Sequence, residues 1–214
     1  MKDIAIFGAG GFGREVACLI NLINKECPTW NLVGFFDDGT EKGTQISHYG
    51  KVLGGMTELN TWEYPLDLAI AIGHPKALHE VIHGITNSNV SFPNVIAPNF
   101  CISDKETFTI GKGNIIGNGC AVSVDVKIGD FNILNADIVL GHDAQIGNYN
   151  VLMPDIRVSG EVTIGEGNLI GVGSIILNQI KIGNNIYLGA GAVLMTKPKD
   201  GGTYIGNPAK LFKY

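Results

Sequence analysis

An aliphatic residue recurs at every sixth position, without interruption, from Ile110 to Leu194. All fifteen positions of this register hold Ile, Leu or Val. A second period of 18 residues is superimposed, because an Ile-Gly pair recurs at every third step from Ile110-Gly111 to Ile182-Gly183. Hexapeptide periodicity is a signature of a parallel β-helix. We therefore predict a stacked, three-sided coil with one inward aliphatic residue on each side.

Stacking follows from the spacing of β-strands, which is about 4.8 Å. Residue i then lies beneath residue i+18, and the aliphatic side chains form ladders that no single coil could bury alone. An ordinary β-sandwich is the alternative, but it does not keep a strict six-residue phase across 85 residues. The step from Ile102 to Ile110 is eight residues, which predicts an irregular first coil.

Composition narrows the possible partners and locations. The net charge is -5 and there is no long basic run, which argues against nucleic acid as a partner. No apolar run reaches about 18 residues, so no membrane span is predicted. The N-terminus lacks a signal-peptide layout, which favours a cytoplasmic location. The four cysteines and the histidines lack a metal-site spacing, so we expect no metal and mostly buried, reduced thiols.

The first 95 residues predict a small Rossmann-like α/β domain. A strand at 4–7 runs into the GxGxxG turn Gly8–Gly13, then a helical pattern and a second strand at 31–36, which ends in Asp37-Asp38. Such glycines let backbone N–H groups approach an anion at a helix N-terminus. The acidic pair could accept hydrogen bonds from ribose or sugar hydroxyls. A glycine turn that serves only strand–helix packing remains open, and so does NAD binding, although the region is short for a full NAD domain.

A further apolar strand is expected at 66–72, followed by a helix over 77–85 with Pro75 as its first residue. The second domain, residues 96–214, holds the β-helix and a C-terminal tail.

One histidine, His142, lies within the repeat. It occupies the third position of its hexad, so it faces outward near a corner, beside Asp143 and directly beneath Gly160 of the next coil. A neighbouring carboxylate raises the basicity of an imidazole and fixes its tautomer. A glycine N–H could donate a hydrogen bond to a developing oxyanion. The alternative is a solvated histidine in a loop.

Together these features resemble the left-handed β-helix acyltransferases, in particular the sugar-nucleotide N-acetyltransferases of the PglD type and their NeuD-like relatives. The resemblance implies a left-handed coil, a homotrimer with active sites between subunits, acetyl-CoA as donor, and a UDP-linked or other nucleotide-linked amino-deoxy sugar as acceptor. It rests on Gly8–Gly13, Phe36-Asp37-Asp38, Ala71-Ile72-Gly73, the hexads, His142-Asp143 and Gly206–Lys210.

The resemblance also implies roles for individual residues. His142 takes the place of the general base and Asp143 that of the acidic residue beside it, although the family often has Glu there. Many members have His where this chain has Phe12. Gly160 matches the N–H that contacts the thioester carbonyl, and the CoA track matches Val151, Val172 and Ala190. The nucleotide-sugar site matches Gly10, Gly11, Phe12, Asp37, Asp38 and Gly73.

Three other functions stay open from sequence. The first is an O-acetyltransferase acting on a sugar hydroxyl, such as that of a sialic acid. The second is an NAD-dependent enzyme that uses the GxGxxG turn, and the third is a non-catalytic β-helix scaffold.

Overall fold

The chain divides into two compact units, Met1–Pro98 and Asn99–Tyr214, and the computed structural model describes residues 1–213. The first unit has a five-stranded, all-parallel sheet in the order β3-β2-β1-β4-β5. Its strands are β1 (Lys2–Phe7), β2 (Trp30–Phe36), β3 (Val52–Gly54), β4 (Leu66–Ile70) and β5 (Val90–Ser91), followed by β6 (Val95–Ile96). Its helices are α1 (Gly11–Glu26), α2 (Met56–Asn60) and α3 (Pro75–Gly84).

The predicted βαβ unit is confirmed as β1, α1 and β2. β1 buries Ile4 and Ile6 completely, and α1 buries Val16 and Ile20 on one face. α3 begins at Pro75, as the sequence predicts. The sequence did not reveal β3, α2 or β5, because each is too short to show a hydrophobic period.

Two glycines of the turn are required for close packing. Gly8 has φ +108°, and a Cβ there would lie 2.7 Å from the Ala71 carbonyl oxygen. A Cβ on Gly13 would overlap the Gly8 carbonyl. The packing role considered for this turn is therefore real at Gly8 and Gly13, and it leaves Gly10 and Gly11 unexplained.

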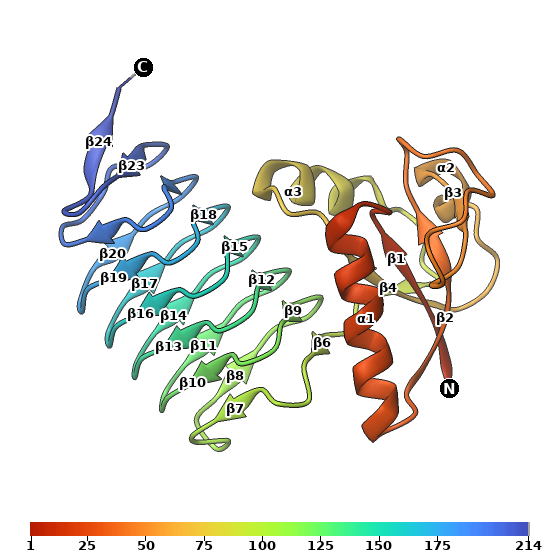
Figure 1. Ribbon diagram of the computed structural model, residues 1–214, viewed down its shortest axis with the longest axis horizontal. Coiled ribbons are helices and arrows are strands. Elements are labelled where there is room, and N and C mark those ends of the chain that lie inside the picture. The colour runs from red at the N-terminus through yellow and green to blue at the C-terminus, as the bar shows by residue number, and fades with distance from the viewer. Residues whose placement is uncertain (214) are drawn as a thin grey trace. The chain divides into compact units, whose positions relative to one another are not determined.

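The second unit is a stack of triangular coils, in which the sixteen strands β7 to β22 are two residues each (Figure 1). The first wall is β7 (Cys101–Ile102), β10 (Ala121–Val122), β13 (Val139–Leu140), β16 (Arg157–Val158), β19 (Ile175–Ile176) and β22 (Val193–Leu194). The second wall is β8 (Thr109–Ile110), β11 (Lys127–Ile128), β14 (Gln145–Ile146), β17 (Thr163–Ile164) and β20 (Lys181–Ile182). The third wall contains β9 (Ile115–Ile116), β12 (Ile133–Leu134), β15 (Val151–Leu152), β18 (Leu169–Ile170), β21 (Tyr187–Leu188), β23 (Thr203–Ile205) and β24 (Lys210–Phe212).

The predicted register is confirmed. Leu140 pairs with Val158 and Ile146 with Ile164, so each coil takes 18 residues. Fourteen of the fifteen hexad aliphatics are buried, and Ile110 is half-buried because β8 is the end strand of its wall. The irregular first coil is also confirmed, since Ile102 pairs with Val122, twenty residues on.

Every sixth residue from Gly113 to Gly191 has a positive φ, and these residues form the corners. The sequence suggested Gly or Asn for such positions, whereas several corners hold Asp. Asp tolerates the left-handed region because its short polar side chain bonds locally. Two corners hold aromatic residues, Phe131 and Tyr149, whose rings stack with centroids 5.8 Å apart.

One inner corner carries a ladder of buried asparagines that the sequence analysis missed. Each side-chain oxygen accepts the backbone N–H of the residue one coil on, at 2.8–3.0 Å. Each following side-chain amide also donates to the oxygen of the previous one, at 2.9–3.1 Å. The recurrence of Asn at an 18-residue interval was the available signal. The ladder consists of Asn114, Asn132, Asn150 and Asn168.

The expectation of mostly buried cysteines is wrong. Cys18 and Cys27 lie on the exposed side and at the end of α1, and Cys101 faces outward on β7. Only Cys120 is buried, and its thiol donates to the Asn135 carbonyl at 2.9 Å.

Burial raises the pKa of the Cys120 thiol to about 11. Roughly one such thiol in a thousand is ionised at pH 8, and the thiolate is the reactive form. We expect three cysteines of the native protein to react rapidly with a thiol reagent, and Cys120 only after denaturation. Thiol counting before and after adding guanidinium measures this, with Cys120→Ala as the control that loses the slow thiol. Four equally fast thiols would contradict the burial of Cys120.

None of the helices in residues 1–213 combines the length and apolarity needed to cross a membrane.

Candidate active site

His142 and Asp143 form the corner between β13 of the first wall and β14 of the second. The backbone of this corner is fixed from both neighbouring coils. The Asp143 N–H donates to the Val124 carbonyl at 3.0 Å, and the Glu161 N–H donates to the His142 carbonyl at 2.8 Å. The strict coil register therefore determines where the imidazole begins.

The imidazole is oriented by its neighbour in sequence. Nδ1 of His142 lies 2.8 Å from Oδ2 of Asp143, and both side chains are about half exposed (55% and 54%). Asp143 has φ +59°, the corner conformation, which turns its carboxylate back toward the ring. With Nδ1–H donating to the carboxylate, Nε2 is the nitrogen that is free to accept a proton.

Nε2 faces Gly160, one coil on. A Cβ at Gly160 would overlap the imidazole, and its closest atom would be Nε2. The missing side chain therefore makes room for the ring. Within residues 1–213, no acceptor is recorded for the Gly160 N–H, so it is available to an incoming oxygen. The structure brings His142, Asp143 and Gly160 together, as the 18-residue spacing predicts.

The three other residues expected on the CoA track lie elsewhere on the coil. Val172 and Ala190 occupy the corner between the third and first walls, one coil apart, where both are exposed. A Cβ on Gly171 would lie 2.6 Å from the Ala190 nitrogen, which shows how closely these corners stack. Val151 lies on the third wall and is fully buried. Within one chain, the first wall separates Val172 and Ala190 from His142.

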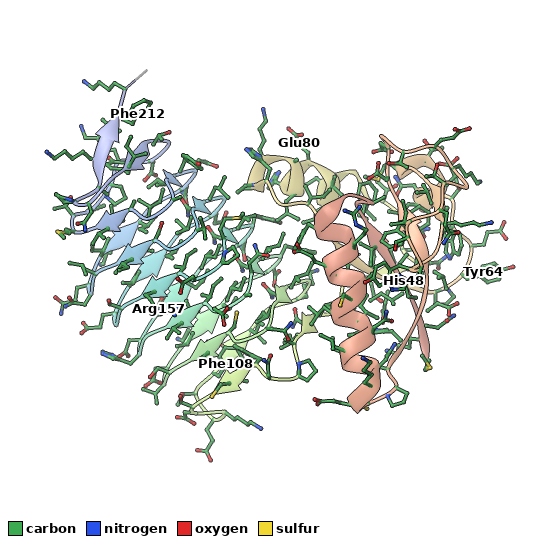
Figure 2. All side chains as sticks on the ribbon, in the orientation of Figure 1. His48, Tyr64, Glu80, Phe108, Arg157 and Phe212 are labelled. Carbon is green, nitrogen blue, oxygen red and sulfur yellow. The ribbon has the colours of Figure 1, made fainter. Side chains whose placement is uncertain are left out.

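The outer surfaces of the walls differ in polarity. Val139 and Ile175 of the first wall are 37% and 38% exposed, and they flank Arg157, which extends outward (Figure 2). Arg157 pairs with Asp155 at 2.9 Å. The second wall presents only polar outward residues: Thr109, Lys127, Gln145, Thr163 and Lys181. The first wall is therefore the more apolar of the two faces that meet at His142.

In the first unit, the residues expected to bind a nucleotide-sugar follow three neighbouring strands. Gly10, Gly11 and Phe12 follow β1, and Gly73 follows β4. Open space lies before Gly10 and Gly73, where an added Cβ would meet no atom within 4 Å. α1 begins at Gly11 without a side-chain cap, so its first N–H groups are unblocked by a side chain. The carboxyl ends of parallel strands are the usual ligand edge of such sheets.

Asp37 and Asp38, which follow β2, have a structural role that the sequence did not reveal. Asp37 accepts the Ala9 N–H at 2.7 Å through Oδ2 and the Gly39 N–H at 2.9 Å through Oδ1. Asp38 accepts the Met56 N–H at 2.7 Å and so fixes the start of α2. Each oxygen keeps a second lone pair for a ligand.

Across the described part of the chain, residues 1–213, no group of three or more His, Cys, Asp or Glu side chains is arranged to hold a metal ion.

Comparison with known families matches both units. Residues 3–85 match the PglD N-terminal domain, and residues 161–195 match the bacterial transferase hexapeptide family of six repeats. The chain is a PglD-like acyltransferase of the hexapeptide-repeat superfamily. The left-handed parallel β-helix expected from the resemblance is thereby established. A comparison with curated proteins gives no match.

Three solved structures resemble this PglD-like chain over its whole length. The acetyltransferase domain of PglB from Neisseria gonorrhoeae FA1090, in complex with acetyl coenzyme A, is 28% identical, with 99% of each chain covered and a TM-score of 0.88. PerB from Caulobacter crescentus, in complex with CoA and GDP-perosamine, is 26% identical, with 100% of this chain and 98% of that chain covered and a TM-score of 0.89. WeeI from Acinetobacter baumannii AYE is 27% identical, with 99% and 100% covered and a TM-score of 0.87.

Proposed function

We propose that the protein transfers acetyl from acetyl-CoA to the amino group of a nucleotide-linked amino-deoxy sugar, with His142 as general base. The observation that carries the proposal is the corner at which Asp143 orients the imidazole and Nε2 faces Gly160. The similar PglB domain binds acetyl coenzyme A, and the similar PerB binds CoA and GDP-perosamine.

The geometry supports direct transfer within a ternary complex. The sugar nitrogen attacks the thioester carbonyl carbon while Nε2 of His142 accepts a proton from that nitrogen. The Gly160 N–H stabilises the tetrahedral oxyanion. The C–S bond then breaks, and the CoA thiolate takes the proton back from the imidazolium. Cys120, the buried thiol, has no part in the reaction.

Assembly as a homotrimer would complete this site. His142 and the pair Val172 and Ala190 flank opposite edges of the first wall, whose outward face carries Val139 and Ile175. Packing of copies through their first walls buries these apolar residues. It also allows the His142 corner of one copy to meet the Val172–Ala190 corner of the next. The CoA track would then run between subunits.

The first unit is proposed to bind the nucleotide. The open space before Gly10 and Gly73 and the uncapped start of α1 suit a diphosphate, which backbone N–H groups at a helix N-terminus favour. UDP and GDP forms are both compatible with this arrangement.

The test is acceptor selectivity. We incubate the protein with acetyl-CoA and each of three acceptors: GDP-perosamine, a UDP-linked amino-deoxy sugar and a free sialic acid. Mass spectrometry should find acetylation of at least one of the two amino sugars. Acetylation of the sialic acid alone would favour an O-acetyltransferase, and no acetylation of any acceptor would favour a scaffold.

A further inference from the structure

Glu161 is the first charged residue on the coil that Nε2 of His142 faces. It follows Gly160 directly and lies one coil beyond Asp143, at the same corner position, with φ +60°. Its backbone N–H donates to the His142 carbonyl at 2.8 Å, so the start of its side chain is fixed relative to the imidazole.

The Glu161 carboxylate is exposed and is contacted from the far side. Nε2 of Gln179, one coil further on, lies 3.4 and 3.3 Å from the two carboxylate oxygens. These are long hydrogen bonds that hold the carboxylate at the corner without neutralising it. Within residues 1–213, no lysine or arginine forms an ion pair with Glu161.

A negative charge of this kind changes which acceptor is favoured at Nε2. Asp143 is engaged by the imidazole, whereas Glu161 keeps an uncompensated charge on the side where the acceptor must dock. A primary aliphatic amine is mostly protonated near pH 7 and is therefore attracted to it. An acceptor that carries its own carboxylate, such as a sialic acid, is repelled.

We propose that Glu161 is a specificity-determining residue that selects an acceptor with a protonated amine, and that Gln179 positions its carboxylate. This inference rests on the proposed function and narrows its substrate class to cationic amino sugars. The bound ammonium loses one proton to solvent before attack. The neutral amine then forms the C–N bond and passes its second proton through His142 to the departing CoA thiolate.

The test compares Glu161→Gln with Glu166→Gln. Glu166 lies at the next corner of the same coil, is also exposed, and receives a hydrogen bond from Asn148 at 2.7 Å. With GDP-perosamine or the UDP-linked amino-deoxy sugar, whichever is acetylated, we expect Glu161→Gln to raise the KM for the sugar roughly five- to tenfold. The change in kcat should be smaller, and Glu166→Gln should resemble the wild type.

Two further readouts separate a charge effect from a structural one. A nucleotide-hexose with hydroxyl in place of the amine, used as an inhibitor, should bind wild type and Glu161→Gln equally. Glu161→Asp, which keeps the charge, should restore most of the affinity for the amine. An unchanged KM in an active Glu161→Gln variant overturns the role of Glu161 alone. A wild-type protein that acetylates neither amino sugar overturns the proposed function as well.

Discussion

Replacing His142 with alanine is expected to lower kcat by about 10²–10⁴-fold, the usual contribution of general-base catalysis. The imidazole is half exposed and makes its one side-chain hydrogen bond to Asp143, so its removal should leave the coil folded. Initial rates with acetyl-CoA and the amino-sugar nucleotide measure the loss. Circular dichroism and the thermal midpoint check the fold.

The matched control is Gln145→Ala. Gln145 is an exposed polar residue three positions on, on the outer face of the second wall. Its loss should leave kcat within a factor of two or so, because surface substitutions away from a site have small effects. A His142→Ala enzyme that keeps most of the wild-type rate would show that the proton is removed by another group or by solvent.

Replacing Asn150 with alanine is expected to destabilise the coil by about 3–6 kcal/mol. The side-chain oxygen of Asn150 accepts both the N–H and the side-chain amide of Asn168, at 3.0 and 2.9 Å. Its amide donates to the Gly165 carbonyl at 2.8 Å. Alanine would leave these buried groups without partners, and each unsatisfied group costs about 1–3 kcal/mol. Urea denaturation of the two proteins measures the difference.

Asn178→Ala is the control for the ladder. Asn178 is exposed, and its loss should change stability by less than about 0.5 kcal/mol. Asn150→Asp is the sharper variant, because it keeps the shape but turns the amide donor into an acceptor facing the Gly165 carbonyl. If Asn150→Ala and Asn178→Ala denature at the same urea concentration, the ladder does not stabilise the fold.

The sequence predicted the second unit well because its information is periodic. An inward aliphatic at every sixth position fixes the wall, the face and the coil of each residue, so the approach of His142 to Gly160 follows from counting. The asparagine ladder obeys the same period, yet it was missed because a search for aliphatic residues ignores buried amides.

The first unit was less predictable because its contacts are not periodic. The helix start and the glycine turn have local signatures, whereas β3 and α2 depend on contacts between distant segments. Asp38 illustrates this, since its carboxylate fixes Met56, eighteen residues away across an irregular loop. Nothing in a local pattern distinguishes such an anchor from a ligand-binding residue.

The separation of Val172 and Ala190 from His142 was not foreseen either. Their roles came from a resemblance, and the hexad phase was not used to ask which corner each residue occupies. Residues 142 and 172 differ by 30, which is one full coil and two walls, so the difference was readable from the sequence.

The fixed phase of the coil also limits how such a chain can change length. Removing six residues upstream of residue 142 would rotate everything that follows by one wall, and the histidine would move to another edge of the triangle. Removing eighteen would keep the edge and shift the groups along the axis by about 4.8 Å. Only whole turns can therefore be gained or lost without moving the histidine to another edge, and its distance along the axis from any other group changes in discrete steps.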